Sequence, residues 1–418
     1  MDSHVFSITE QRTYVICLAT NLIPLAPTRN QFCLEVTSEQ TNIMAATQTS
    51  GDEVVVVDLR SDTLTQPSPL MKQAMVEASL GDDVFGEDPT VIALQKKVAA
   101  LLEKEDALFF PTGTMCNLVS VLTHCQQRGS EVILGDQSHI YLYEQGGISQ
   151  LGGVHPRAVR NLPDGTFDLH ELRKLVRSDN VHFPVSALVC VENTHNVAGG
   201  KVLPLDWLDE LGATCRQLGL PLHMDGARLL NAATALDLPP ARLVRSCTTV
   251  SLCLSKGLGA PVGSVLAGPE DFIERARRTR KALGGGMRQA GILAAAGIFG
   301  LDHVYPTLGR DHRLLQELAK AVEACGSKVI RCDPQATHTN ILLVDCDLNV
   351  VTPEALCNRM GQATQEEVMS LGEHVIVQML PITDTKARLV LHCDVTPNQV
   401  QSAARKLRYV IKELDSDC

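Results

Sequence analysis

A single lysine, Lys256, interrupts the apolar run VSLCLSKGLGAPVGSVLAG at residues 250–268, which holds no carboxylate that could pair with it. Taken alone, it is best interpreted as a strand-end lysine whose ammonium group reaches solvent. An unprotonated lysine amine is also a nucleophile that condenses with aldehydes to form a Schiff base. Lys256 is therefore a candidate for covalent chemistry, provided that a second group in the chain supports it.

Asp225, which ends the strand-like run LPLHMD, supplies such a group. An aspartate at a strand end is most often a helix N-cap. Here, however, it precedes the candidate nucleophile in a chain whose strands alternate with helices. An aspartate that pairs with a pyridinium nitrogen keeps this nitrogen protonated, so that the ring draws electrons from a breaking bond. A lysine that forms imines and an aspartate that holds a pyridine together indicate pyridoxal 5'-phosphate (PLP) chemistry.

A cofactor of this kind also needs an anion site and a group that covers its ring. The turn PTGT follows the strand-like ALFF and opens a helix, so that the amides of Gly113 and Thr114 would face an anion at the positive helix end. This pattern is common, and a nucleotide site is disfavoured because LGAPVGS does not match G-x-G-x-x-G. His139 in DQSHIYLYE is the candidate for stacking on the ring, and Tyr141 and Tyr143 are the competing candidates.

The surrounding pattern predicts the elements that would position these residues. Short β-rich runs alternate with helical stripes, which indicates crossover units and a mostly parallel sheet. We expect strands near residues 107–110, 131–135, 186–192, 220–225 and 248–255, and helices near 91–101 and 205–218. In such sheets, ligands bind beyond the carboxyl ends of the strands. Thr112, His139, Asp225 and Lys256 each follow one of these strands, so we expect them at one sheet edge.

The order of predicted elements changes after residue 300, where a helix-like segment at 311–324 leads into further strand-like runs. The predicted fold class is α/β. We expect a large cofactor-binding domain at residues 53–305 and a smaller C-terminal α/β domain at residues 306–418. Residues 1–52 show little periodicity, and we expect them to form a disordered extension.

The bulk composition disfavours several classes of protein. With 44% hydrophobic and 20% charged residues, the chain has the balance of a globular protein. A net charge of −11 disfavours nucleic acid and anionic membranes as partners, and no apolar run reaches the roughly 20 residues of a membrane-spanning helix. The 14 cysteines lack metal-binding spacing and fit buried thiols in a reducing compartment. We therefore expect no metal, and a cytoplasmic location with the mitochondrion as the alternative.

Several long runs of the sequence carry a family resemblance. They are DLRSDTLTQPSP, GDDVFGEDPT, FPTGTMCN, DQSHIYLYEQGG, VHFP, VENTHNVAGGKVLPL, HMDGARLLNA, LSKGLGAPVGSVLAG and KALGGGMRQAGILAAAGI. Together they resemble the L-threonine aldolase family of fold-type I PLP-dependent enzymes, over nearly the whole chain beyond residue 54. The resemblance weakens at 325–385. It implies an aspartate aminotransferase-like large domain and a homodimer or homotetramer with active sites at subunit interfaces. The implied reaction is retro-aldol cleavage of L-threonine or L-allo-threonine to glycine and acetaldehyde.

The resemblance also implies roles for the residues that the chemistry singled out. Lys256 would form the Schiff base with PLP, and Asp225 would pair with the pyridine nitrogen. Arg228 would lie near the phenolate oxygen of the cofactor and near the substrate. Gly113 and Thr114 would hold the phosphate.

Five further residues match the family pattern. His139 would stack on the ring, and His182 in VHFP would be a second active-site histidine; either one would take the proton of the β-hydroxyl group. Arg288 in GGGMRQAG would reach a phosphate across a subunit contact. Ser61 and Arg388 would hold the substrate carboxylate. Without the resemblance, His182, Arg288 and Arg388 would be interpreted as a strand-start residue, a surface charge and a cross-strand partner.

Some alternatives remain open. Another fold-type I PLP lyase, with β-elimination as its reaction, or an aminotransferase would share the fold but break a different bond. A catalytically silent homologue would keep only the fold, which the intact set of Lys256, Asp225, Arg228 and Arg388 disfavours. In the run ENTHN at 192–196, which follows a buried strand, we expect Glu192, Asn193 and His195 to border the predicted site.

Overall fold

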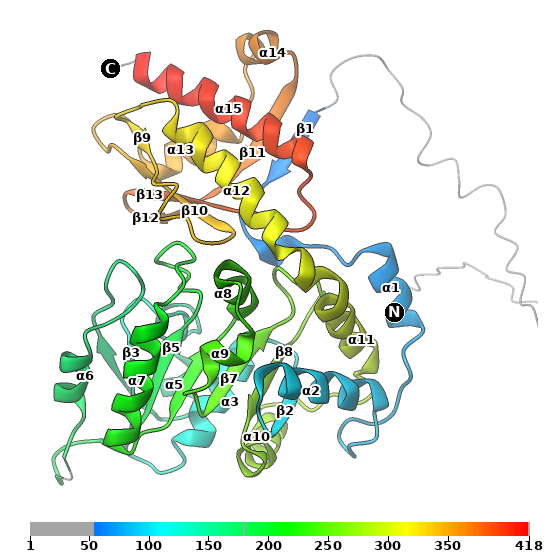
Figure 1. Ribbon diagram of the computed structural model, residues 1–418, viewed down its shortest axis with the longest axis vertical. Helices are drawn as coiled ribbons and strands as arrows, with labels where there is room; N and C mark the ends of the chain where they lie inside the picture. The colour runs from blue at the N-terminus through cyan, green and yellow to red at the C-terminus, as the bar shows by residue number, and fades with distance from the viewer. Residues whose placement is uncertain (1–53, 179, 417–418) are drawn as a thin grey trace, which may run out of the picture. The chain divides into compact units, whose positions relative to one another are not determined.

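The computed structural model describes residues 54–178 and 180–416 of the 418-residue chain (Figure 1). The extension predicted at residues 1–52 lies outside the described residues. Strands and helices alternate along the first two thirds of the described chain, which confirms the predicted α/β class. Within the described ranges, every helix is too short or too polar to cross a lipid bilayer.

The largest sheet has the strand order β2-β8-β7-β6-β5-β3-β4. Its strands are β2 (Asp106–Phe110), β3 (Ser130–Gly135), β4 (His155–Val159), β5 (Val185–Glu192), β6 (Leu222–Asp225), β7 (Thr249–Cys253) and β8 (Ser264–Gly268). Strands β3 to β7 are parallel to one another, whereas β8 is antiparallel to its two neighbours, β7 and β2. Strand β2 therefore runs in the same direction as β3 to β7. The sheet is mostly parallel, as predicted, and the carboxyl ends of these six strands meet at one edge.

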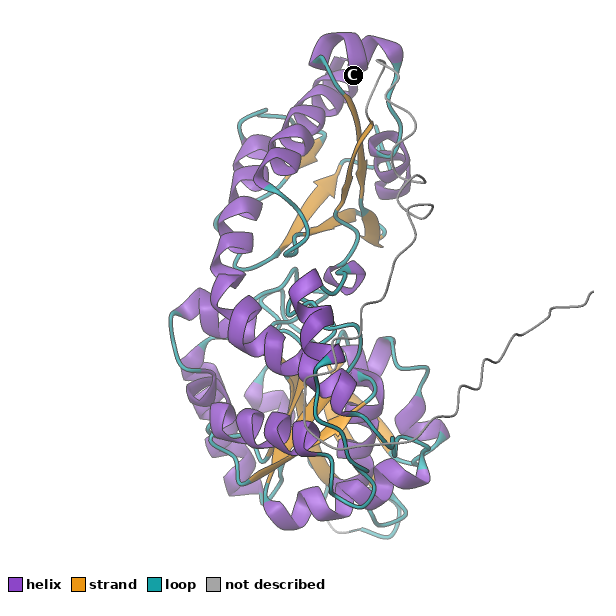
Figure 2. Cartoon of the chain, turned by 90° about the vertical axis from the view of Figure 1, so that its right-hand side faces the viewer, coloured by secondary structure: helices purple, strands orange, loops and turns teal. Residues whose placement is uncertain are grey.

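Helices cover both faces of this sheet (Figure 2). They are α1 (Pro69–Val76), α2 (Pro89–Leu102), α3 (Gly113–His124), α4 (His139–Leu142), α5 (Gly147–Gln150), α6 (Leu169–Leu175), α7 (Leu205–Leu218), α8 (Leu229–Leu236), α9 (Pro240–Val244), α10 (Glu270–Ala282) and α11 (Gly291–Phe299). Side chains of a strand alternate between its faces. Accordingly, Ala107 and Phe109 of β2 pack in one core with α2 and α7, whereas Leu108 and Phe110 pack in another with α3 and α10.

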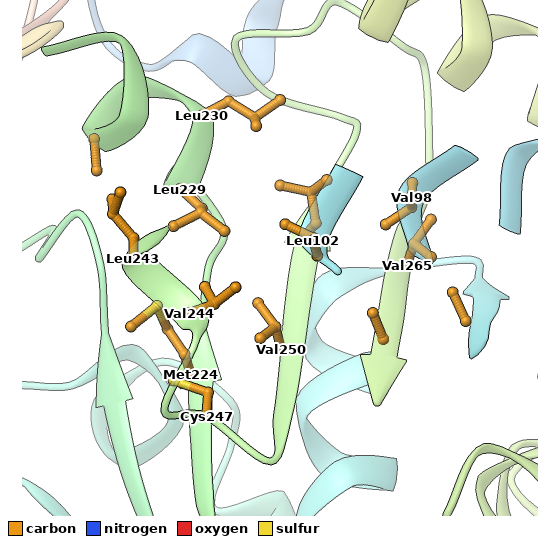
Figure 3. Close-up of a cluster of buried hydrophobic side chains, with 14 of the residues drawn as sticks. Val98, Leu102, Met224, Leu229, Leu230, Leu243, Val244, Cys247, Val250 and Val265 are labelled. Atoms are coloured by element: carbon orange, nitrogen blue, oxygen red, sulfur yellow. The ribbon is translucent and has the colours of Figure 1, made fainter. Parts of the chain in front are cut away.

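The first of these cores fixes the strands that end at the predicted site. Figure 3 shows Met224 of β6 and Val250 of β7 among side chains of helices α8 and α9, such as Leu229 and Val244. All four are buried. Burial of each such side chain stabilises the fold by about 1.5–3 kcal/mol. The ends of β6 and β7, where Asp225 and the Lys256 loop begin, are therefore anchored by packing.

The C-terminal elements and β1 together form two further sheets. A four-stranded antiparallel sheet has the order β12-β13-β10-β9, and a two-stranded parallel sheet pairs β1 with β11. The elements are β1 (Val54–Asp58), a π-helix (Gly300–Val304), a 3₁₀ helix (Tyr305–Thr307), α12 (Leu308–Glu323), β9 (Ile330–Arg331), β10 (Ile341–Cys346), α13 (Pro353–Met360), α14 (Gln365–Leu371), β11 (His374–Gln378), β12 (Leu380–Thr383), β13 (Lys386–Val390) and α15 (Pro397–Ser416). This arrangement positions β13, which carries Arg388.

The start of the described chain packs with the C-terminal elements. Val57 and Leu59 are buried in the same core as α12 and α15, and β1 pairs with β11 along its whole length. Residues 54–59 fall within the large domain predicted at residues 53–305, yet β1 pairs with a strand more than 300 residues later in the chain. The domain boundary near residue 305 stays a prediction.

Candidate active site

The carboxyl edge of the seven-stranded sheet brings together most of the predicted residues. Asp225 ends β6, and Lys256 follows β7. His139 begins α4 just beyond β3. One ring nitrogen of His139, one carboxylate oxygen of Asp225 and one of Glu144 all lie within 4.8 Å of one another. Thr65 donates a hydrogen bond to the carbonyl oxygen of Lys256 at 3.2 Å, which ties the lysine loop to the segment that follows β1.

Asp225 is buried, and both oxygen atoms of its side-chain carboxylate accept hydrogen bonds. Its Oδ2 atom accepts a hydrogen bond from Nδ2 of Asn117 at 2.8 Å, and its Oδ1 atom accepts one from the backbone N–H of Ala227 at 3.0 Å. A carboxylate offers about four lone-pair positions. Asp225 therefore keeps the capacity to accept a further proton donor, such as a pyridinium N–H group.

His139 is held from two sides. Its backbone N–H donates to Glu192 Oε2 at 2.6 Å, and its Nδ1 atom lies 3.0 Å from Glu144 Oε1. Burial opposes protonation of the ring, but the hydrogen bond to Glu144 and the charges of Asp225 and Glu144 outweigh it and raise the pKa of His139. The ring of Tyr143 lies 5.6 Å away in a tilted orientation. Glu192, the first residue of the ENTHN run, thus contacts the site.

The predicted anion site lies at the start of α3. Thr112 caps this helix by accepting a hydrogen bond from Met115 N–H at 3.1 Å, and the first turn of a helix leaves N–H groups free for an anion. A Cβ atom at position 113 would lie only 2.8 Å from Cys253 Sγ, so the close approach of α3 to the β7 end requires Gly113. Thr114 is exposed, which leaves its hydroxyl group available to a ligand.

Arg228 forms a buried ion pair that the sequence did not reveal. It donates two hydrogen bonds to Asp62, from Nε at 2.8 Å and from Nη2 at 2.7 Å. Burial raises the pKa of Asp62, but the charge and hydrogen bonds of Arg228, the charge of Lys256 and a hydrogen bond from Asn340 reverse this effect and lower it to about 2. Asp62 is therefore ionised at neutral pH, and it holds the guanidinium of Arg228 in place.

Arg388 and Ser61 lie on neighbouring segments of the site. Arg388 donates to Asn196 Oδ1 at 2.9 Å and to the carbonyl oxygen of Arg60, the residue before Ser61, at 3.2 Å. Burial and the charge of Arg228 lower the pKa of Arg388. The Ser61 hydroxyl oxygen accepts hydrogen bonds from Thr63 and caps the short helix that carries Asp62. The structure thus brings together the two residues expected to hold a carboxylate.

The structure does not bring His182 or Arg288 to the site of their own chain. His182 is exposed and precedes β5, so it lies at the amino end of a strand whose carboxyl end carries Glu192. At about 3.3 Å per residue, the length of β5 separates the two ends. Arg288 is also exposed; it donates to Asp82 at 2.9 Å and lies over the ring of Phe85 at 5.7 Å.

The sequence analysis did not single out Asn117, Glu144 or Asp62, and it reached Asn196 only as the last residue of the ENTHN run. Asn117 bridges Asp225 and Glu144, and Asn196 accepts hydrogen bonds from two arginines. Asn117 lies one helical turn after Gly113 on α3, the helix that begins at the predicted anion site. That spacing is the one signal in the sequence that pointed to it. Glu144 and Asn196 show no comparable spacing that would have marked them as site residues.

Comparisons with known proteins agree with one another on the family of this chain. Residues 58–347 match the beta-eliminating lyase family. The chain is 46% identical to the probable low-specificity L-threonine aldolase 2 of Arabidopsis thaliana over 82% of this chain and 94% of that protein. It is 42% identical to the low specificity L-threonine aldolase of Escherichia coli K12, over 84% of this chain and 98% of that one. The fold is similar to that of the threonine aldolase of Leishmania major, with a TM-score of 0.69 and 21% identity over 85% and 99% of the two chains.

Proposed function

The chain belongs to the beta-eliminating lyase family and, within it, groups with the low-specificity L-threonine aldolases, and on this premise we propose that it is a PLP-dependent carbon–carbon lyase. Its reaction is the cleavage of L-threonine, L-allo-threonine or both to glycine and acetaldehyde. The observation that carries the proposal is the convergence of Lys256, Asp225 and His139 at one sheet edge, beside the buried Arg228 and Arg388.

The residues at this edge fit PLP. The close approach at Gly113 leaves no room for a larger residue beside the helix terminus that would take the phosphate. Asp225 has lone pairs to spare for a pyridinium N–H group, and Lys256 offers its amine for covalent attachment. When bound, PLP supplies an electron sink for the bond that breaks between Cα and Cβ of the substrate.

Arg388, with Ser61 beside it, is proposed to bind the substrate carboxylate. A guanidinium group makes two parallel hydrogen bonds to a carboxylate, which fixes the orientation of the group as well as its position. This orientation decides which bond at Cα stands perpendicular to the cofactor ring. Arg228, which Asp62 holds in place, lies beside Arg388, because both arginines donate to Asn196 Oδ1.

A base must take the proton of the β-hydroxyl group, and two histidines are candidates. His139 lies at the site, and its Nδ1 atom is engaged by Glu144, so Nε2 is the nitrogen that can accept a proton. His182 stands at the opposite end of β5 and can serve only the site of a neighbouring subunit. We extend the same reasoning to Arg288. A homodimer or homotetramer with shared sites would give both residues a role.

The cytoplasm is the proposed location, with the mitochondrion as the alternative. All the cysteines that the structure describes are free thiols, and seven of them are buried, which suits a reducing compartment.

The experiment that tests the function is a substrate assay on the purified protein with added PLP. Acetaldehyde release from L-threonine and from L-allo-threonine is measured by coupled reduction, and pyruvate release from L-serine is measured in parallel as the signature of β-elimination. We expect acetaldehyde with at least one of the two threonine isomers and little pyruvate. Pyruvate without acetaldehyde would instead establish β-elimination. The absence of both products would favour a catalytically silent homologue. Lys256→Ala serves as the inactive control.

A further inference from the structure

Glu144 is a buried carboxylate for which the proposed reaction has no direct use. Its Oε1 atom accepts a hydrogen bond from Asn117 Nδ2 at 2.9 Å and lies 3.0 Å from His139 Nδ1. Its Oε2 atom is buried and has no hydrogen-bond partner within the described part of the chain. Burial of a carboxylate costs free energy unless its neighbours compensate for it. A functional role would explain why this one is retained beside the site.

Asn117 sets the direction in which Glu144 is connected. Its Oδ1 atom accepts a hydrogen bond from Ser251 Oγ at 2.8 Å and lies 3.3 Å from Nε2 of His223. Burial lowers the pKa of His223 to about 4, so this ring is neutral at pH 7. Because an amide oxygen can only accept, Nε2 of His223 is the nitrogen that donates to Asn117 Oδ1, and Nδ1 accepts from the hydroxyl groups of Ser120 and Thr249.

Because its oxygen is occupied in this way, Asn117 must point its NH₂ group at the two carboxylates. One N–H group reaches Glu144 at 2.9 Å and the other reaches Asp225 at 2.8 Å. The acid proposed to hold the pyridine nitrogen and the acid beside the stacking histidine therefore share one amide. A displacement of either carboxylate would disturb the other.

We propose that Glu144 is a positioning residue that acts through His139: it fixes the ring in the form that carries a proton on Nδ1 and, through Asn117, aligns it with Asp225. His139 then presents Nε2 as its proton-accepting atom. This inference rests on the proposed function, since the orientation of His139 matters for catalysis only if its ring covers the cofactor or accepts the substrate proton. In this role Glu144 acts only through its contacts with His139 and Asn117.

The charged groups around His139 decide what loss of Glu144 would do. Glu144 and Asp225 favour the protonated ring, whereas Lys256 and burial oppose it; Glu192 binds the backbone N–H, and the Tyr143 ring packs alongside. An opposite charge at this distance shifts a pKa by about 1–3 units. Neutralising Glu144 while keeping a hydrogen-bond acceptor should therefore make His139 harder to protonate.

Glu144→Gln tests this directly. Neutral histidines react with diethyl pyrocarbonate, so the pH dependence of modification, resolved by mass spectrometry of the His139 peptide in the full-length protein, reports its protonation. We expect the midpoint to fall by about one pH unit or more relative to the unchanged protein. In the PLP-loaded enzyme, we expect kcat with L-threonine to fall about 10-fold with a smaller change in KM.

Glu171→Gln is the matched control, because Glu171 lies 3.9 Å from the exposed His170 and far from this network in the sequence. It should leave the His139 midpoint and kcat unchanged. An unchanged midpoint in Glu144→Gln would overturn the proposal. If that variant does not fold, the unsubstituted protein decides: a His139 midpoint at or below the ordinary histidine value of about 6.5 would overturn it as well. Loss of the proposed aldolase activity alone would leave this chemical readout intact, so the two failures are distinguishable.

Discussion

Arg228 and Arg388 donate hydrogen bonds to the same atom, Asn196 Oδ1, at 3.3 and 2.9 Å. Two guanidinium charges therefore meet at one neutral oxygen in a buried site. Asp62 neutralises Arg228 through two hydrogen bonds. Within the described chain, the hydrogen-bond acceptors of Arg388 are all neutral oxygen atoms. Its Nε atom has no hydrogen-bond partner there. The site thus holds one guanidinium whose charge is balanced within the protein and one that a substrate carboxylate would balance.

Arg388→Lys should therefore weaken substrate binding more than catalysis. Lysine keeps the charge but cannot form two parallel hydrogen bonds to a carboxylate. Loss of one charge-assisted hydrogen bond costs about 1.5–3 kcal/mol, which corresponds to a rise in KM for L-threonine of roughly 10- to 100-fold. Steady-state kinetics with Arg331→Lys, an exposed substitution on β9, provide the comparison. A KM equal to that of the control would show that another group binds the carboxylate.

Asp62→Asn should destabilise the protein because it leaves the Arg228 guanidinium buried without a counter-charge. Removal of one partner of a buried ion pair costs about 3–5 kcal/mol. The pKa of Asp62 is lowered to about 2, so the contribution of its charge is fully present above pH 4 and is lost as the pH falls towards 2. Urea unfolding at pH 7 measures the loss, with the exposed Asp384→Asn as control. Equal stabilities would mean that the pair contributes nothing net.

Gly113→Ala should weaken cofactor binding through a steric clash, and a second substitution should relieve that clash. The added methyl group would meet Cys253 Sγ at 2.8 Å and displace the first turn of α3. We expect the Kd for PLP, measured by fluorescence titration, to rise about 10-fold. Cys253→Ala removes the clashing sulfur atom, so the double variant should regain most of the affinity. Equal affinities for the single and double variants would place the cause elsewhere.

Asp311→Asn should stabilise the protein at alkaline pH. Burial raises the pKa of Asp311 to about 6, although Arg310 and His392 act in the opposite direction. A raised pKa means that the folded state favours the neutral acid, so stability is present below about pH 4 and is lost as the pH rises through 6. The amide removes that loss. We expect the free energy of unfolding to increase by roughly 1–3 kcal/mol at pH 8 and to change little at pH 4. A variant that is less stable at pH 8 would contradict this.

The sequence predicted the sheet and the residues at its edge because both depend on local signals. Apolar runs of four to eight residues indicated the strands, and Asp225, His139 and Lys256 stand directly beyond such runs. Once the sheet is mostly parallel, its carboxyl ends must meet. The placement of these residues at one edge then followed from their positions in the chain.

The sequence could not predict contacts between distant segments. Asn117 meets Asp225, 108 residues away, and Asp62 meets Arg228, 166 residues away, and neither pair has a local pattern. The pairing of β1 with β11 was missed for the same reason, since its valines would suit any buried strand. Arg388 was identified from the family resemblance alone; its unbalanced charge became evident only in the folded chain.

The central claim, that Lys256 binds the cofactor covalently, is tested most directly by reduction of the PLP-loaded protein with borohydride followed by peptide mapping. Reduction converts a Schiff base into a stable secondary amine that survives proteolysis. We predict one phosphopyridoxyl label, on the peptide that contains Lys256, and none in Lys256→Ala. A label on a different lysine, or no label on a protein that has bound PLP, would contradict the account.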